Sequence, residues 1–592
     1  MKKLYSSLTL IGILFISSVG IAQTVSGKVF DQANQTLPGV VVKDKQSGNG
    51  VATDIDGNYS LNLGAGKHTL EFVLIGYINQ TKEINLKDGQ NLALNVTMQE
   101  DDKMAEEVVV VGYGVQRKRD VTGSITRIDG KELTQLPVPS FEAALQGRGA
   151  GIQVSQGSGL AGSGSLVRIR GISSISAGGD PLYVVDGIPI TQNPFLRGNS
   201  GAMNSNPLTF LNPNDIESIE VLKDAAATGI YGSRGANGVV LITTKRGKKQ
   251  GLSLDLSVRV GTSEAAARPN MMTTSEYLQM RQEAWENDGG TGYTWLPSLS
   301  GALDSPEVRE QKYKEAQKTN TNWFDELTGV GIKQSYNIGI NYVMNKAKFY
   351  ASLSNDDNGS YIVGNRFVRN SARLNADINI CKKLLYSVGG SFTQSVNNRV
   401  DAAWSGGIGE AMSHALPYYP IYDSTGKYFM GNGGYSNPVA YREQRQWVNF
   451  EKRVLTNHSL TYLINDYWSL RATGSLDYLD QVEMIYMPIG VNVGQLQDYA
   501  EKFPTWVTNW NSNGTINYNR TYKEDHRVTF MAGSEAQKST TRGYSQVRYP
   551  GLAALPTAAE VDADTITPQF GNAYEEVTTF VSFFGRFNYS ID

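Results

Sequence analysis

The chain of 592 residues contains 62 glycines, 19% charged residues and a formal net charge of −3 at pH 7. Glycine is more frequent, and charge less frequent, than the roughly 7% and 25% of average proteins. The mildly acidic charge argues against general nucleic-acid binding, so we expect no nucleic-acid partner. With a mean hydropathy of −0.32 and no later apolar run of about 18 residues, a polytopic helical membrane protein is excluded.

Residues 1–22 predict a cleaved export signal. A positive start (Lys2 and Lys3) precedes a short apolar run (residues 8–16), and Ala22 is a small residue directly before the expected cut. The alternative is a buried first strand or helix. The chain has a single cysteine, so we expect an exported protein without an intramolecular disulfide.

Residues 23–98 predict a small β-sandwich, because short alternating segments are separated by Gly, Pro and Asn turns. Asp54, Asp56 and Asn58 match the first, third and fifth ligand positions of a calcium loop. However, Tyr59 stands at the sixth position, where glycine is needed, and the acidic twelfth ligand is missing. We therefore predict a tight turn and no metal site.

Residues 99–114 predict a charged linker followed by a strand. Four consecutive valines, Val108 to Val111, favour a sheet. An exposed strand of this kind invites pairing with another chain. Two interpretations stay open: an ordinary core strand, or a docking strand that adds to the sheet edge of a partner.

Residues 115–247 predict a mixed α/β domain of short strands and a short helix capped by Ser140. The glycines at 157, 159 and 162 have the spacing of a dinucleotide-binding loop. Such a loop must open a helix, whereas residues 166–170 predict a strand. We therefore expect no nucleotide cofactor.

Residues 248–592 alternate between apolar and polar side chains over about ten residues at a time, which is typical of transmembrane β-barrel strands. We expect strands near residues 252–262, 333–343, 347–357, 366–378, 384–396, 453–464, 468–480, 514–522, 526–537 and 579–592. Tight and long connections alternate between them. Outer-membrane barrels have short periplasmic turns and long outer loops, whereas a soluble sandwich has no reason to sort its loops. The long connections are therefore expected outside the cell.

Several motifs together resemble one family, the SusC/RagA-type TonB-linked outer-membrane transporters of Bacteroidota. Residues 23–98 resemble its carboxypeptidase-regulatory-like extension, and residues 108–114 resemble its TonB box region. The stretches that resemble its plug are residues 171–175, 181–187, 215–224 and 231–244.

The resemblance implies a mainly β protein with a sandwich, a mixed α/β plug and part of a 22-stranded antiparallel transmembrane β-barrel. It implies import of oligosaccharides or peptides across the outer membrane, energised by the TonB-ExbB-ExbD complex and assisted by a SusD-like surface lipoprotein. The implied partner-binding residues are Glu107, Val108, Val109, Val110, Val111, Gly112 and Tyr113. The implied plug-motif residues are Arg168, Arg170, Gly171, Asp186, Gly187, Tyr231, Gly232, Arg234 and Gly235.

The plug arginines Arg168, Arg170 and Arg234 have two interpretations: contacts with carboxylates of the barrel wall, or ordinary solvated charge. Four aromatic residues expected in a long loop (Trp404, Tyr418, Tyr419 and Trp447) could stack on sugar rings, form an aromatic girdle or pack the loop; packing is favoured.

About ten strands are expected where the family has 22, and an open sheet leaves unpaired edge groups that lipid does not tolerate. We therefore expect an N-terminal portion of a longer protein, so transport by this portion alone is in doubt. The four histidines are scattered and no nucleophile motif appears, so neither an enzyme nor a metal or cofactor is expected. Rival functions are a non-transporting surface receptor or signal transducer of the same architecture, and a secreted β-modular adhesin.

Overall fold

The computed structural model describes residues 23–31, 35–74, 77–99, 108–111, 114–117, 124–134, 140–172, 178–191, 195, 208–248, 251–402, 407–430, 437–488, 491, 499–522, 526–548, 569–570 and 573–591. The chain divides into two compact units on either side of Val108. The expected export signal lies outside the described residues. None of the described helices is long and apolar enough to cross a membrane.

The first unit is a β-sandwich, as predicted. Its strands are β1 (Gln23–Phe30), β2 (Val41–Asp44), β3 (Gly50–Ala52), β4 (Asn58–Leu63), β5 (Gly66–Val73), β6 (Gln80–Leu86), β7 (Leu92–Ala93) and β8 (Val96–Thr97). One sheet contains β4, β1, β7 and β8, and the other has the order β3-β2-β5-β6. Alternate residues such as Val25, Val29, Leu70 and Phe72 fill the core between the sheets. The predicted tight turn is also present, because the Asp54 carboxylate accepts hydrogen bonds from the backbone N–H groups of Asp56 (3.0 Å) and Asn58 (2.8 Å).

The plug domain is built on a five-stranded sheet with the order β11-β16-β17-β14-β15. These strands are β11 (Ile125–Asp129), β14 (Leu182–Val185), β15 (Ile188–Pro189), β16 (Ile216–Leu222) and β17 (Val239–Thr244). Beside them lie the hairpin β12 (Ile152–Gln156) and β13 (Ser165–Ile169), and the short helices α2 (Gly130–Leu133), α3 (Phe141–Ala144), α4 (Ala225–Thr228), η2 (Pro213–Asp215) and η3 (Gly229–Gly235). Ser140 caps α3 as predicted, accepting from Ala143 N at 3.3 Å. A strand, β13, follows the glycine-rich loop, which agrees with the rejection of a dinucleotide site.

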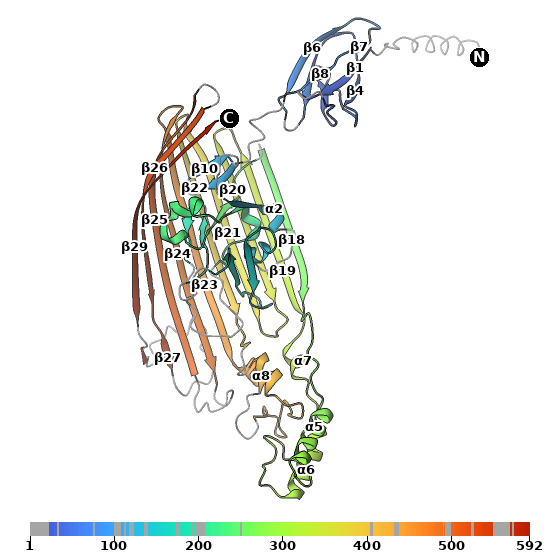
Figure 1. The fold of residues 1–592 in the computed structure, drawn as a ribbon, viewed down its shortest axis with the longest axis vertical. Coiled ribbons are helices and arrows are strands. Elements are labelled where there is room, and N and C mark those ends of the chain that lie inside the picture. Colours follow the sequence, from blue (N-terminus) through green and yellow to red (C-terminus); the bar gives the residue numbers. More distant parts are fainter. Residues whose placement is uncertain are drawn as a thin grey trace, which may run out of the picture. The chain divides into compact units, whose positions relative to one another are not determined.

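Ten antiparallel strands form a wall, and the plug lies against one face of it (Figure 1). They are β18 (Gly251–Ser263), β19 (Gly331–Val343), β20 (Ala347–Gly359), β21 (Arg366–Cys381), β22 (Leu384–Asn398), β23 (Gln446–Leu463), β24 (Trp468–Met487), β25 (Tyr499–Tyr522), β26 (His526–Gly543) and β29 (Tyr574–Ile591). Two short strands, β27 (Gln546–Arg548) and β28 (Gln569–Phe570), extend this sheet beside β25. The alternation has the predicted sense, since Leu353, Leu374 and Phe392 are exposed outside while polar residues line the lumen face.

Five wall strands extend at least five residues further than predicted, in each case at the end near a long connection. For example, β23 begins at residue 446 instead of 453, and β25 begins at residue 499 instead of 514. In these extensions both faces carry polar residues: Gln481 and Thr505 pair on the buried lumen face, whereas Lys538 and Arg542 are exposed on the outward face. The alternation of apolar and polar residues, from which the strand ends were predicted, therefore stops before the hydrogen-bond ladder does.

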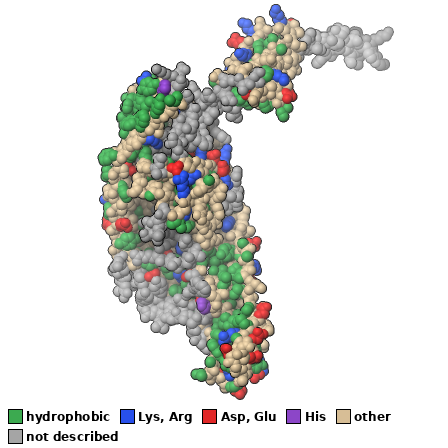
Figure 2. Space-filling model, viewed as in Figure 1, with side chains coloured by type: hydrophobic (Ala, Val, Ile, Leu, Met, Phe, Trp, Pro, Cys, Tyr) green, Lys and Arg blue, Asp and Glu red, His purple; other side chains and the backbone are tan. Residues whose placement is uncertain are grey.

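The long connections hold five helices that the sequence interpretation did not place. They are α5 (Thr274–Asn287), α6 (Pro306–Ala316), α7 (Trp323–Leu327), α8 (Ile408–Ser413) and α9 (Pro438–Gln444). We call them the helical lobe. Leu278, Leu296, Trp323, Tyr418 and Val439 share one core there, so two connections far apart in sequence pack together. Figure 2 shows acidic side chains on the surface of the end that carries α5 and α6.

Candidate functional site: the interface between plug and wall

The plug is fastened to the wall by a short segment, residues 208–215, which we call the anchor segment. It ends in the helix η2, where Asn212 accepts a hydrogen bond from Asn214 N at 2.9 Å and Pro213 follows directly. Asn is a favoured N-cap residue, and Pro fits the first helical position because no N–H is needed there. This local turn places Asp215 against the wall at the start of β16.

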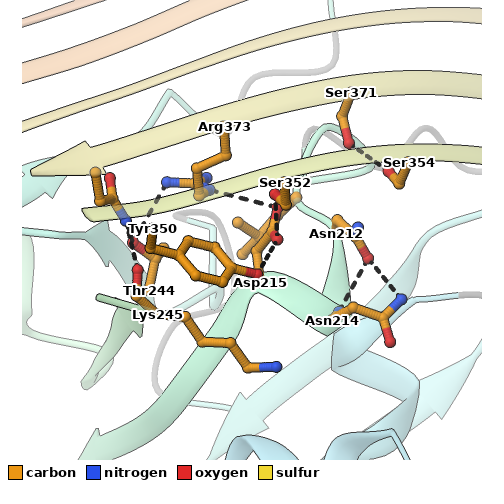
Figure 3. Close-up of polar contacts among 12 residues, drawn as sticks. Asn212, Asn214, Asp215, Thr244, Lys245, Tyr350, Ser352, Ser354, Ser371 and Arg373 are labelled. Carbon is orange, nitrogen blue, oxygen red and sulfur yellow. Dashed lines mark hydrogen bonds and ion pairs between the residues drawn. The ribbon is translucent and has the colours of Figure 1, made fainter. Parts of the chain in front are cut away.

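Asp215 is the centre of a buried polar network (Figure 3). Its Oδ1 accepts hydrogen bonds from Tyr350 OH (3.0 Å) and Ser352 Oγ (2.6 Å), both on β20. Arg373 of β21 lies between two plug carboxylates, with Nε 3.5 Å from Asp215 Oδ2 and Nη1 3.6 Å from Asp186 Oδ2. The Arg373 and Asp215 side chains are only 4% and 3% exposed. Because an unpaired buried charge is strongly destabilising, this network ties the plug to the wall.

Asp186 and Gly187 form the tight turn between β14 and β15. Both have a positive φ, 49° and 86°, which is the geometry that an Asp-Gly hairpin turn adopts. The Asp186 carboxylate accepts from Thr244 N (2.9 Å) and Thr244 Oγ1 (2.6 Å). Asn375 of β21 donates to the same Thr244 hydroxyl at 2.9 Å. The turn, the end of β17 and the wall are therefore joined by one hydrogen-bond chain.

Arg369 of β21 holds the backbone of the anchor segment. Its Nη1 donates to the carbonyl oxygens of Thr209 (2.7 Å) and Leu211 (2.9 Å). Its Nη2 lies 2.6 Å from Asp356 Oδ2 on the neighbouring strand. A guanidinium has several N–H donors in a rigid fork, so one side chain can bind a wall carboxylate and two plug carbonyls together.

Arg453 of β23 contacts the anchor segment through an aromatic ring. It forms a bidentate pair with Asp477, with both nitrogen–oxygen distances at 2.7 Å, and the two side chains are 2% and 1% exposed. The Arg453 Cζ lies 4.2 Å from the centre of the Phe210 ring, within cation–π range. Thr393 of β22 also donates to the Phe210 carbonyl oxygen at 3.1 Å.

Two asparagines complete the contacts of the anchor segment. Asn212 Nδ2 donates to Asn337 Oδ1 on β19 at 3.0 Å, and Arg259 Nη2 on β18 donates to Asn214 Oδ1 at 2.7 Å. Six of the eight residues of the anchor segment therefore contact six neighbouring wall strands, β18 to β23. Most of these contacts use charged or amide groups, which give direction as well as attraction.

Arg234 contacts the wall on other strands. Its Nη2 lies 3.0 Å from Glu535 Oε2 on β26, it also donates to Gln537, and its Cζ lies 5.3 Å from the ring of Phe580 on β29. Glu535 is 3% exposed. Of the two interpretations for the plug arginines, contact with a wall carboxylate therefore describes Arg234.

Arg168 and Arg170 instead pair inside the plug. Arg168 contacts Asp180, and Arg170 contacts Asp224. Of the two interpretations, contact with a wall carboxylate does not describe these two residues, because each guanidinium pairs with a carboxylate of the plug itself. Short-range pairing of this kind is not visible in strand alternation.

The remaining plug-motif residues have backbone or packing roles. Gly171 has φ 93°, and Gly232 has φ 59° with ψ −144° inside η3, conformations that favour glycine. At Gly235 a Cβ atom would lie 2.8 Å from the Thr228 carbonyl oxygen. Tyr231 is 6% exposed and packs with strands of the plug sheet.

The valine run forms a strand. Val108–Val111 is β9, which pairs with β10 (Gly114–Arg117) in a two-stranded sheet separate from the larger sheets of the described chain. Glu107, Gly112 and Tyr113 lie outside the described residues. The strand conformation was expected from the four valines, and its role as a docking strand stays a prediction.

The loop aromatics serve packing where the structure describes them. Tyr418 and Tyr419 are 1% and 3% exposed, and their hydroxyls donate to the Pro297 carbonyl oxygen at 3.0 and 3.3 Å. Trp447 is the second residue of β23 rather than a loop residue, since that strand extends further than expected. Trp404 lies outside the described residues.

Sequence reasoning did not single out the lumen-facing charges of the wall. Arg369, Arg373, Arg453 and Asp477 all occupy the polar face of their strands, where the alternation marks them only as polar. A charged residue in the middle of a predicted membrane strand is costly unless it is paired. That signal identifies them as candidates for plug contacts, although it does not identify their partners.

Comparisons with known proteins agree with this architecture. The TonB-dependent Receptor Plug Domain family model matches residues 117–239, and the CarboxypepD_reg-like domain model matches residues 25–110. TonB-dependent receptor P26 of Formosa agariphila is 31% identical over 96% of this chain and 54% of its own length. TonB-dependent receptor SusC of Bacteroides thetaiotaomicron is 28% identical over 99% of this chain and 56% of its own length.

These matches place the chain among SusC/RagA-type TonB-dependent receptors. A solved structure of the RagAB peptide importer in an open-open state matches with a TM-score of 0.66 and 25% identity, over 82% of this chain and 55% of that chain. The chain spans about half the length of the curated relatives it matches. Within that half, the SusC/RagA-type plug and the wall that holds it are both present.

Proposed function

We propose that the chain is part of an outer-membrane transporter that imports oligosaccharides or peptides. The observation that carries this proposal is the plug domain docked on the lumen face of the wall through the buried Asp215–Arg373 network. A plug held by polar contacts closes a barrel and can still be moved, because each contact has a polar alternative in water. The relatives named SusC and RagAB, the latter described as a peptide importer, support this function.

The proposed energy source is the TonB-ExbB-ExbD complex, which would act through β9. A strand with four β-branched residues can add to the sheet edge of a partner through backbone hydrogen bonds. The first plug strand after it is β11, which lies at the edge of the plug sheet and pairs with β16. Force applied at β9 therefore reaches the plug sheet at an edge, where strands are separated most easily.

A SusD-like surface lipoprotein is the proposed partner at the long connections, and outer-membrane lipid is the proposed environment of the apolar outer face. The proposal includes export through residues 1–22 and no enzymatic step. It also keeps the expected division into a regulatory-like sandwich (23–98), linker and TonB box region (99–114), plug (115–247) and barrel portion (248–592).

The test is Val109→Pro in the full-length protein of the native host. A growth panel of glycans and peptides first identifies a nutrient whose use requires the gene. Proline removes a backbone donor from the docking strand, so energised uptake should stop while the amount of protein in the membrane stays normal. Val109→Thr is the matched control, since threonine keeps the N–H group and the β preference.

Uptake at the wild-type rate by Val109→Pro would show that β9 is not the docking strand. A gene that is needed for sensing a nutrient but not for its uptake would point to a signal transducer of the same architecture.

A further inference from the structure

A cavity of about 40 Å³ lies where β22 and β23 meet the helical lobe. Its lining includes Arg399 directly after β22, Trp447 on β23, and Arg445 directly after α9. Arg399 and Trp447 are 6% and 3% exposed and have the lumen-facing parity of their strands. Ile362 and Val400 of the lining also pack in the cluster around plug residue Leu160, so the cavity borders the plug.

Two guanidinium groups share one aromatic ring in this cavity. The Cζ atoms of Arg399 and Arg445 lie 4.7 and 4.5 Å from the centre of the Trp447 ring. Burial, with the like charge of Arg445, lowers the pKa of Arg399 to about 10 against the opposing effect of Glu483. Arg399 is still charged at neutral pH, in a place where a further negative group would stabilise it.

The acids beside the cavity are already bound. Asp401 Oδ2 accepts from Arg445 Nη1 (2.9 Å) and Tyr441 OH (3.2 Å), and Glu483 Oε1 accepts from Trp447 Nε1 (2.8 Å). Arginine has five N–H donors. The Nε of Arg445 is buried and has no acceptor among the residues that the structure describes. Arg445 therefore still offers donors to a ligand.

The third arginine of the lining is occupied. Arg442 donates to the carbonyl oxygen of Glu326 at 2.5 Å and pairs with Glu443. Its guanidinium is thus held toward the helical lobe, and Arg445 is the arginine of the lining with a buried N–H group that faces a ligand.

We propose that this cavity binds a carboxylate group of the imported substrate, with Arg445 as the main donor. The inference rests on the proposed transport function and adds to it a substrate class, acidic oligosaccharides or acidic peptides. At roughly 10–15 Å³ per water molecule, the cavity of about 40 Å³ has room for a carboxylate group. The paired N–H groups of a guanidinium fit the two oxygens of that ligand.

The test is calorimetric titration of the purified full-length protein with two acidic probes and their neutral counterparts. The probes are oligogalacturonate against its methyl ester, and triglutamate against triglutamine. At least one acid should bind more tightly than its neutral counterpart. Arg445→Gln should weaken that binding by about tenfold to a hundredfold, the range expected for hydrogen bonds to a charged group. The affinity of Arg445→Lys for the acid should lie between those of the wild type and Arg445→Gln, since lysine keeps the positive charge but lacks the paired N–H groups of the guanidinium.

Arg268→Gln is the matched control, because Arg268 is an exposed arginine paired with Asp325 on the helical lobe. The affinity of this variant for the acidic probe should equal that of the wild type. The thermal midpoint of each variant separates a binding loss from unfolding. Preference for the glycan or for the peptide acid identifies the source of the carboxylate, and either supports the inference.

Equal binding of acid and neutral probe, no binding of either acid, or wild-type affinity in folded Arg445→Gln would overturn the inference. The transport proposal is judged separately by Val109→Pro, which does not touch the cavity. If Val109→Pro loses uptake and Arg445→Gln binds the acid as the wild type does, the transport proposal is kept and this binding site is rejected. If Arg445→Gln loses binding and Val109→Pro takes up the nutrient normally, the binding site is kept and energised transport through β9 is rejected.

Discussion

Replacing Asp215 by Asn should loosen the plug. Asn keeps the shape of the side chain but removes the charge that accepts from Tyr350 and Ser352 and faces Arg373. Each hydrogen bond to a charged group contributes about 1.5–3 kcal/mol. An amide retains one acceptor oxygen, so we expect a net loss of about 3 kcal/mol in plug docking, not the full sum. At 1.4 kcal/mol per factor of ten, the undocked population should rise about a hundredfold.

The assay is the entry of a large hydrophilic antibiotic, such as vancomycin, into cells that carry the full-length variant. Asp215→Asn should increase sensitivity at an unchanged protein level. Asp357→Asn is the matched control on β20, the strand of Tyr350 and Ser352: Asp357 pairs with Arg366, which is 58% exposed, and such surface pairs contribute only about 0–1 kcal/mol. Equal sensitivity of the two variants would refute the view that Asp215 holds the plug.

Three further predictions follow from the same geometry. A peptide tag after Ser424 should be detected on intact cells and a tag after Asn345 only after the outer membrane is broken; the opposite result would invert the topology. Asp477→Ala should lower the free energy of unfolding by about 3–5 kcal/mol because it removes the bidentate carboxylate partner of the buried Arg453, whereas Asp477→Leu with Arg453→Met should restore most of it in urea titrations. Burial raises the pKa of Glu220 to about 7 from 4.5, so the folded plug binds this proton more tightly than the unfolded chain. Its stability should therefore fall on the order of 3 kcal/mol as the pH rises from 4.5 through 7, and Glu220→Gln should remove that slope.

The sequence predicts the wall strands well because their alternation follows from one apolar and one polar environment. Leu353, Leu374 and Phe392 face outward as expected. The prediction fails at the ends near the long connections, where polar side chains stand on both faces and the two-residue period disappears. Trp447 was placed in a loop for this reason, although it belongs to β23.

Of the candidate site, only the tight turns could be predicted from the sequence. The Asp186-Gly187 turn is evident from the sequence, since few residues tolerate its backbone conformation. The partners of Asp215 are not, because they lie 135 to 158 residues further along the chain and depend on the register of β20 and β21. The helical lobe was missed because its helices pack across two separate connections, and neither connection alone shows an apolar face that would identify a core.

The plug contacts lie on a path from the proposed docking strand. β11 pairs through five residue pairs with β16, from Ile125↔Leu222 to Asp129↔Ser218. β16 in turn begins directly after Asp215. A pull that arrives at β11 is therefore passed to the strand that continues into the anchor segment, and the buried contacts of that segment with six wall strands oppose it. The β11–β16 ladder is short and lies at a sheet edge, whereas the anchor contacts are charged and buried. For this reason we expect β11 to separate before residues 208–215 leave the wall, so that the plug opens while still attached.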